Sequence, residues 1–226
     1  MNSGAFCMHA EKQIKAYGGY SMVGAQKVTL PEKVKPYLFV KRGLDIVLSA
    51  MGIVIAAPVV LLFSILIVLE TPGSPFYVQK RVGKGGRTFN LVKLRSMRKD
   101  AERSGAQWAA AHDPRVTKVG KFIRQTRIDE LPQLLTVLKG DMSLIGPRPE
   151  RPFFTEKFDR EIPGFKNRLL VKPGLTGLAQ VNGGYDLTPQ EKLVFDLEYV
   201  SHLSFTLEWQ IMLKTVRVLL TGEGAR

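Results

Sequence analysis

The sequence predicts a mainly helical α+β domain that carries a small β-hairpin and is anchored by a proline-interrupted membrane helix. A run of 24 uncharged residues, 46–69, exceeds the roughly 20 residues that a helix needs to cross a bilayer. Residues 76–94 alternate apolar and polar side chains around a glycine turn, a pattern typical of a hairpin. Most of the chain after this hairpin shows helical spacing and helix-capping residues.

Composition restricts the kinds of partner and site. The 226 residues carry a formal charge of +13, so we expect an acidic partner: nucleic acid, anionic lipid or a phosphorylated small molecule. Cys7 is the only cysteine, which excludes an intramolecular disulfide and a thiolate metal cluster. His9, His112 and His202 lie far apart without ligand-like spacing, so the sequence predicts no zinc site.

The apolar run is divided evenly by a proline. Pro58 leaves 12 residues on each side, and each half is about 18 Å long as a helix, close to one leaflet of a hydrocarbon core about 30 Å thick. Lysines and arginines flank both ends, whereas a spanning helix should show an excess on one side. We therefore predict a re-entrant hairpin over residues 37–70, bent at Pro58. A kink in a spanning helix is the alternative.

The elements before and after the hairpin follow from local signals. Residues 1–36 show no period and are predicted to be a flexible extension. Strands are expected at 76–82 and 88–94, and residues 98–111 are helical or loosely ordered. Helices are expected at 118–126 and at 131–138, where Gly140 is the terminating residue. Thr188, Pro189 and Glu191 form a capping box for a helix ending near Ser201, and a last helix is expected at 207–220.

One acidic pair could carry chemistry. Asp129 and Glu130 directly precede Leu131-Pro132, where a helix should begin because proline is tolerated in a first turn. Capping of that helix is the structural interpretation. The functional interpretation is an ionised aspartate that attacks phosphorus, beside an acid that can hold a divalent ion. Arg148 lies between two prolines that fix its backbone, which suits bidentate phosphate binding.

From about Lys41 to the C-terminus the chain resembles the bacterial sugar transferase family, the monotopic polyprenyl-phosphate phosphoglycosyltransferases. Separate stretches carry the resemblance in order: KRGLDIV, VKLRSM, DPRVTKVGKFIRQTRIDELPQLLTVLKGDMSLIGPRPE, VKPGLTGLAQVNG and the final GEGAR. Many relatives continue VNG with arginine and asparagine, whereas this chain has Gly184-Tyr185-Asp186, so the resemblance does not identify the donor sugar.

The resemblance implies a two-step reaction. Asp129 would attack the β-phosphorus of a nucleotide sugar, expected to be a UDP-sugar, and hold the phosphosugar covalently until polyprenyl phosphate displaces it. Asp129 and Glu130 would bind Mg²⁺. Glu130 would help to position this ion or would accept a proton. Arg124 and Arg148 match the family's phosphate-binding arginines. Further candidates are Lys93 and Arg95 for phosphate binding, and Pro147 and Pro149 for the nucleotide loop.

The resemblance also implies a location and partners. Residues 71–226 would form a catalytic domain on the cytoplasmic face of the inner membrane, in contact with lipid. A homodimer is a further expected partner state that the resemblance does not decide. The large relatives carry an additional N-terminal membrane bundle, so this sequence corresponds to a compact form. A nucleic-acid-binding protein is one rival, but the sequence shows no reading module and no interleaved stacking aromatics. A membrane scaffold is the other, and it would not need an acid pair beside a proline-fixed arginine.

Overall fold

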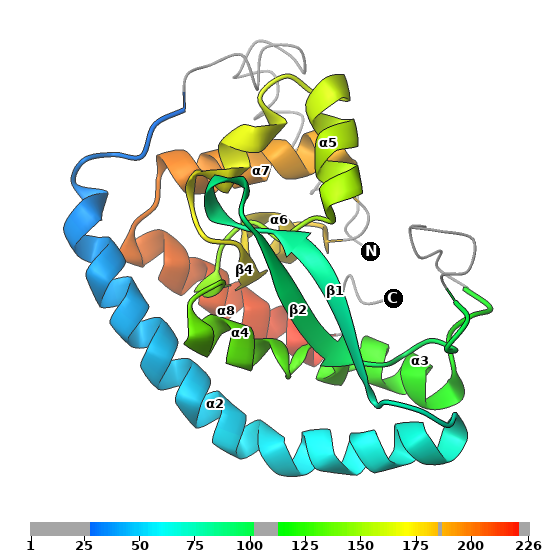
Figure 1. Ribbon diagram of the computed structural model, residues 1–226. Coiled ribbons are helices and arrows are strands. Elements are labelled where there is room, and N and C mark those ends of the chain that lie inside the picture. Colours follow the sequence, from blue (N-terminus) through cyan, green and yellow to red (C-terminus); the bar gives the residue numbers. More distant parts are fainter. Residues whose placement is uncertain (1–27, 102–112, 185–186, 222–226) are drawn as a thin grey trace.

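A computed structural model describes residues 28–101, 113–184 and 187–221, and within them the protein is mostly helical with two small sheets (Figure 1). The helices are α2 (Val34–Glu70), α3 (Lys118–Gln125), α4 (Gln133–Lys139), α5 (Pro152–Glu161), α6 (Leu178–Val181), α7 (Pro189–Ser201) and α8 (Phe205–Thr221). The strands are β1 (Phe76–Val82), β2 (Thr88–Leu94), β3 (Ser143–Ile145) and β4 (Gly174–Thr176). Short 3₁₀ turns are η1 (Lys84–Gly86), η2 (Ile128–Glu130) and η3 (Phe165–Leu170).

The apolar run lies in α2, the single described helix long and apolar enough to cross a membrane. The expected division into two helices at Pro58 is not observed, because α2 continues through Pro58 as one element. Figure 1 shows that α2 nevertheless bends, so that its blue and cyan parts wrap two sides of the molecule. A proline inside a helix removes one hydrogen bond and is the usual cause of such a bend.

One face of α2 packs on the rest of the protein along most of its length. Buried positions recur from its first turn to its last turn, and they are Val34, Lys41, Asp45, Ser49, Ala56, Ser64 and Ile67. The opposite face exposes large apolar side chains, including Phe39, Val54, Ile55, Leu61 and Leu69. Such a face is poorly suited to water and well suited to lipid.

Charged side chains of the first half of α2 bind the segments on either side of the α4–β3 turn. Arg42 donates to the carbonyls of Val137 and Leu138, both at 2.7 Å, at the C-terminal end of α4. The carboxylate of Asp45 accepts hydrogen bonds from the Ser143 hydroxyl and the Leu144 N–H at 3.0 Å. These contacts satisfy polar groups that would otherwise be buried alone, so they fix α2 against α4 and β3.

The far end of α2 is fixed to β2 and α3. Glu70 accepts from the N–H groups of Lys118 and Val119 at 2.7 and 3.1 Å, at the start of α3. Ile67, Leu94 and Ile123 form a buried apolar cluster that joins α2, β2 and α3. Both ends of α2 are therefore fastened to one and the same domain.

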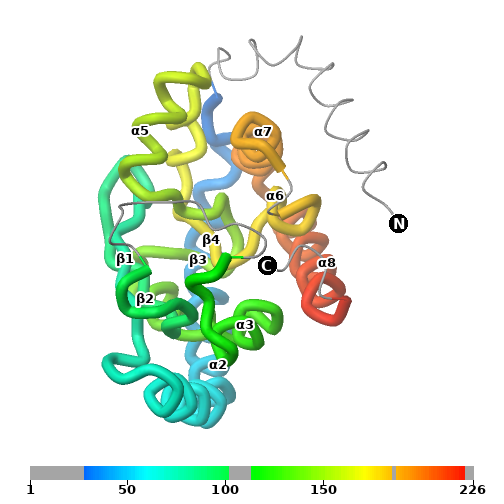
Figure 2. Tube along the Cα trace, turned by 90° about the vertical axis from the view of Figure 1, so that its right-hand side faces the viewer, coloured from blue at the N-terminus to red at the C-terminus, as the bar shows by residue number. Residues whose placement is uncertain are grey.

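The β1–β2 hairpin has the predicted bounds, and its antiparallel register pairs Phe76 with Leu94. Figure 2 shows this hairpin on one side of the molecule and α7 and α8 on the other, with β3 and β4 between them. The predicted capping box at Thr188 and Glu191 is also confirmed, and α7 ends at Ser201 as expected. The main core lies around α7, where Leu193, Val194 and Phe195 are fully buried.

Several elements were not predicted, among them the strands β3 and β4 and the helix α5. Strands β3 and β4 pair in parallel although each has three residues, too few for a period to be visible in the sequence. Gly146 makes this pairing close, because a Cβ there would overlap the carbonyl of Lys172. Helix α5 follows the Pro-Arg-Pro segment directly and begins with Pro152. Residues 1–27, most of 98–111, and Tyr185-Asp186 lie outside the described residues.

Candidate active site

The acidic pair lies in η2, the turn between α3 and α4. Arg127 precedes this turn with φ 57°, the single non-glycine residue with positive φ in the described ranges. A left-handed arginine is strained and lets the chain reverse directly into η2. Helix α4 begins after Pro132 and receives no side-chain cap, so the structure gives Asp129 no capping role there. Asp129 is instead buried, with 7% of its surface exposed.

Burial changes the protonation chemistry of Asp129. Loss of hydration and, to a smaller extent, the neighbouring charge of Glu130 raise its pKa to about 7, although Lys93, Arg148 and Arg124 act in the opposite direction. The expectation of a fully ionised aspartate is therefore wrong for the protein alone, because desolvation outweighs the nearby cations. Burial also disfavours ionised Glu130, but Arg148 outweighs it and lowers the pKa of Glu130 below its usual range.

Glu130 and Arg148 form a two-pronged ion pair. Arg148 Nη2 lies 2.5 Å from Glu130 Oε1, and Nη1 lies 3.2 Å from Oε2. This is the planar fork geometry in which arginine binds a carboxylate most strongly. The sequence assigned these residues to different tasks, metal positioning and phosphate binding. The structure joins them, so a phosphate that reaches Arg148 meets a guanidinium already oriented by Glu130.

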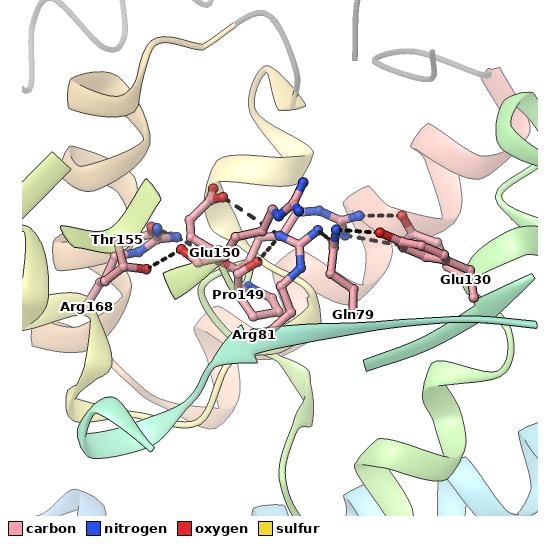
Figure 3. A network of polar contacts seen from close by, with 11 residues as sticks. Gln79, Arg81, Glu130, Pro149, Glu150, Thr155 and Arg168 are labelled. Atoms are coloured by element: carbon pink, nitrogen blue, oxygen red, sulfur yellow. Dashed lines mark hydrogen bonds and ion pairs between the residues drawn. The ribbon is translucent and has the colours of Figure 1, made fainter. Parts of the chain in front are cut away.

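The backbone around Arg148 is held by side chains from three other elements, and Figure 3 shows two of them, Arg81 and Arg168. Arg168 of η3 donates to the carbonyl of Arg148 at 2.9 Å and pairs with Asp196 of α7 at 2.6 Å. Arg81 of β1 donates to the carbonyl of Pro149 at 2.9 Å. Tyr199 of α7 donates to the carbonyl of Ile145 at 3.1 Å, just before the loop. The two prolines therefore do not act alone in fixing Arg148.

A cavity of about 400 Å³ opens over the acidic pair. Ten lysines and arginines line it against three carboxylates, those of Asp129, Glu130 and Glu150. The cations are Arg81, Lys93, Arg95, Arg98, Lys99, Arg115, Arg124, Arg148, Arg151 and Lys192. The volume suits a small ligand, and the excess of positive charge suits one that carries several phosphate groups.

The four predicted phosphate-binding residues all line the cavity, but one of them also binds the backbone at the end of α2. Lys93 lies on β2 facing the cavity, 5.6 Å from the centre of the Tyr77 ring, and burial lowers its pKa. Arg124 and Arg148 line the cavity as expected. Arg95 also reaches its wall, but its guanidinium donates to the carbonyls of Thr71 and Pro72 and so holds the end of α2. This is a structural use that the sequence did not indicate.

The loop prolines lie on different sides. Pro149 lines the main cavity, whereas Pro147 lines a small adjoining pocket with Arg168 and Val171. Sequence reasoning missed Arg81, Glu150, Arg168 and Lys192. Glu150 directly follows the Pro-Arg-Pro segment, which was the one local signal available. The others reach the site from distant elements and carry no local pattern.

The donor set of the cavity can be compared with the needs of Mg²⁺. No group of three or more His, Cys, Asp or Glu side chains that could hold a metal occurs within the described parts of the chain. Magnesium in enzymes is commonly bound by one or two carboxylates together with substrate phosphates and waters. The adjacent carboxylates of Asp129 and Glu130 on the cavity wall fit that mode of binding.

Comparison with known proteins gives a consistent family. The sequence profile of the family described as bacterial sugar transferase matches residues 36–222. A protein of Bacillus subtilis (strain 168), provisionally named undecaprenyl-phosphate N-acetylgalactosaminyl 1-phosphate transferase, is 60% identical over 162 residues, 72% of this chain and 90% of that protein. The UDP-N-acetylgalactosamine-undecaprenyl-phosphate N-acetylgalactosaminephosphotransferase of Aeromonas hydrophila is 49% identical over 84% of this chain.

A third relative is named for another sugar. The UDP-glucose:undecaprenyl-phosphate glucose-1-phosphate transferase of Caulobacter vibrioides is 40% identical over 82% of this chain and 71% of its own length. The matched part of the Aeromonas protein is 46% of that protein, so this chain spans about half the length of some relatives and nine tenths of others.

The buried ion pair between Arg168 and Asp196, which holds the Arg148 carbonyl in place, can be tested through the stability of the protein. Asp196→Asn leaves the charge of Arg168 buried and unpaired, since the two side chains are only 2% and 4% exposed. We expect the free energy of unfolding to fall by about 3–5 kcal/mol, measured by denaturant titration in detergent. The control is Asp159→Asn, which removes the partner of Lys166 in a pair with side chains 28% and 58% exposed. That change should cost less than about 1 kcal/mol. Equal losses of stability in the two variants would contradict a stabilising role for the buried pair of Arg168 and Asp196.

Proposed function

The chain belongs to the bacterial sugar transferase family, and we propose that it moves a phosphosugar from a UDP-sugar to undecaprenyl phosphate with release of UMP. The observation that carries this proposal is the cavity of about 400 Å³ in which a buried acidic pair is surrounded by ten cations. Both substrates of such a transfer carry phosphate, and a cavity of this charge stabilises the negative charge that develops on the transferred group.

The transfer proceeds in two displacements at the same phosphorus. A carboxylate oxygen of Asp129 attacks the β-phosphorus of the UDP-sugar, the bond to the oxygen of UMP breaks, and the phosphosugar stays on Asp129 as an acyl phosphate. An oxygen of undecaprenyl phosphate then attacks that phosphorus. The bond between phosphorus and Asp129 breaks, the carboxylate of Asp129 is restored, and the sugar leaves linked to undecaprenyl diphosphate. A single cavity can thus serve both substrates in turn.

The cations around Asp129 have separate tasks in this scheme. Arg148, oriented by Glu130, binds the phosphoryl oxygens, and Lys93 and Arg124 lower the pKa of the nucleophile toward the ionised form that attacks. We propose that Asp129 and Glu130 would hold Mg²⁺ in this cavity. When bound it would neutralise phosphate charge and lower the pKa of Asp129 further.

The packing of α2 supports a monotopic placement on the cytoplasmic face of the inner membrane. Its inner face contacts the domain from Lys41 to Ile67, so α2 cannot carry one end to the far side of a bilayer without the domain. Its outer face is apolar and exposed. We infer that the bent helix enters the cytoplasmic leaflet and returns, which brings the cavity to the level of lipid phosphates.

The rival function of nucleic-acid binding rested on the charge of +13. Among the described residues, ten of the cations line a cavity whose volume suits a small ligand and which also contains three carboxylates. A polynucleotide needs a long positive groove or face instead. The geometry therefore favours the transferase.

Release of UMP by the detergent-solubilised protein tests the function. The assay contains Mg²⁺, a short polyprenyl phosphate and, in turn, UDP-N-acetylgalactosamine and UDP-glucose, the sugars for which three relatives are named. Because Asp129 attacks only when ionised, kcat/KM should be low below its pKa of about 7 and rise to a plateau above it. The kcat profile should lie at lower pH, since bound cations stabilise the ionised form.

Asp129→Asn is the matched control, because it keeps the shape of the side chain and removes its nucleophilic oxygen. It should reduce UMP release to below a tenth of the wild-type rate. Retention of more activity would remove Asp129 as the nucleophile. A wild-type protein that releases no UMP from any nucleotide sugar would contradict the proposed function itself.

Cysteine labelling in intact cells tests the topology. Single cysteines replace Lys35 and Lys80 in turn, both exposed, in a background without Cys7. An impermeant reagent should label neither position, because both ends of α2 lie in the cytoplasm, whereas a permeant reagent should label both. Pro58→Leu, which restores the missing hydrogen bond, is the variant in which position 35 could become accessible in a fraction of molecules. External labelling at position 35 with Pro58 present would show that α2 spans the membrane.

A further inference from the structure

The cavity contains one carboxylate that the proposed reaction does not use. Glu150 lines the cavity beside Arg151 and Phe154, and its side chain is only 14% exposed. Its backbone carbonyl accepts from Val82 N–H at 2.9 Å, which fixes the residue at the end of the Pro-Arg-Pro segment. Figure 3 shows Glu150 near Arg81 and Pro149 in the middle of the network, with Thr155 and Arg168 at one end and Glu130 at the other.

The carboxylate of Glu150 has acceptor capacity left over. Arg81 Nη1 lies 3.9 Å from Glu150 Oε2, too long for a hydrogen bond, and Lys192 acts on Glu150 through its charge from the same cavity. Arg81 donates instead to the Pro149 carbonyl and to the side chain of Gln79. A largely buried carboxylate without hydrogen bonds is costly, and a ligand with hydroxyl groups would satisfy it.

The charge of Glu150 also disfavours one kind of contact. A phosphate group placed directly against its carboxylate would be repelled, whereas an uncharged group would not. The part of the donor next to Glu150 should therefore be uncharged. In a nucleotide sugar the uncharged parts are the hexose and the nucleoside, and both carry hydroxyl groups that donate hydrogen bonds.

We propose that Glu150 binds the donor by accepting hydrogen bonds from hydroxyl groups of its hexose or ribose, an inference that rests on the proposed function. Neighbouring hydroxyls can share the two carboxylate oxygens, as two N–H groups do in an arginine pair. Phe154 lies on the same part of the wall and supplies an apolar surface beside these hydroxyls. Glu150 thus contributes to the selection of the donor, and Arg148 and Asp129 to the chemistry.

Measurements of ligand binding can distinguish hydrogen bonding by Glu150 to donor hydroxyls from a role in which Glu150 only balances the positive charge of the cavity. UDP-N-acetylgalactosamine, UMP and inorganic diphosphate are titrated by calorimetry into wild type, Glu150→Gln and Glu161→Gln in detergent. Glu161 lies at the other end of α5 with its side chain 53% exposed, so its substitution removes the same charge outside the cavity. Binding of diphosphate also reports whether each variant retains a folded cavity.

The two explanations of Glu150 predict opposite signs. Removing a negative charge from a cationic cavity should leave diphosphate binding unchanged or stronger. If Glu150 binds hydroxyls, Glu150→Gln should weaken the binding of UDP-N-acetylgalactosamine about tenfold or more, the usual effect of removing a charged acceptor. Glu161→Gln should leave that binding unchanged. Weaker UMP binding as well would place the ribose at Glu150, and unchanged UMP binding would place the hexose there.

A result in which Glu150→Gln binds the UDP-sugar as tightly as wild type, or more tightly, would overturn the inference and leave the proposed function intact. Wild type that binds diphosphate but no nucleotide sugar would overturn the proposed donor and this inference with it.

Discussion

The burial of two adjacent carboxylates is the constraint on which the rest of the site depends. Asp129 and Glu130 lose most of their hydration, and the charge of Glu130 makes ionisation of Asp129 less favourable. Such a pair persists only where cations are held in place around it. Arg148 pairs directly with Glu130, and Lys93 and Arg124 stand near Asp129. The result is that Asp129, the proposed nucleophile, has a pKa raised to about 7 that a further nearby cation would lower.

The architecture holds those cations in place. Lys93 comes from the hairpin, Arg124 from α3, and Arg148 from a loop whose carbonyls are bound by Arg81 and Arg168. Helix α2 ties these elements together, since its first half binds α4 and β3 and its last turn binds the start of α3. Helix α2, the proposed membrane anchor, is therefore part of the framework of the site, and the helix that exposes the apolar face also supports the proposed catalytic residues.

Local signals in the sequence were sufficient for the elements they govern. The hairpin alternates with period two, and the Thr188 capping box is contained in four residues, so both were predicted with their bounds. Long-range contacts were not predictable in this way. The parallel pairing of β3 with β4 and the pair between Arg168 and Asp196 join distant segments. The use of Arg95 at the end of α2 and the raised pKa of Asp129 depend on burial, which a motif does not record.

The central claim is that Asp129 carries the phosphosugar between the two displacements. Its most direct test omits the lipid acceptor: the protein is mixed with UDP-sugar and Mg²⁺, quenched, digested and analysed by mass spectrometry. The account predicts one equivalent of UMP released at most, and a peptide containing Asp129 that is heavier by the mass of the phosphosugar. The same peptide of Asp129→Asn should be unmodified. UMP release that occurs only when polyprenyl phosphate is present, with no modified peptide, would indicate direct transfer and contradict the account.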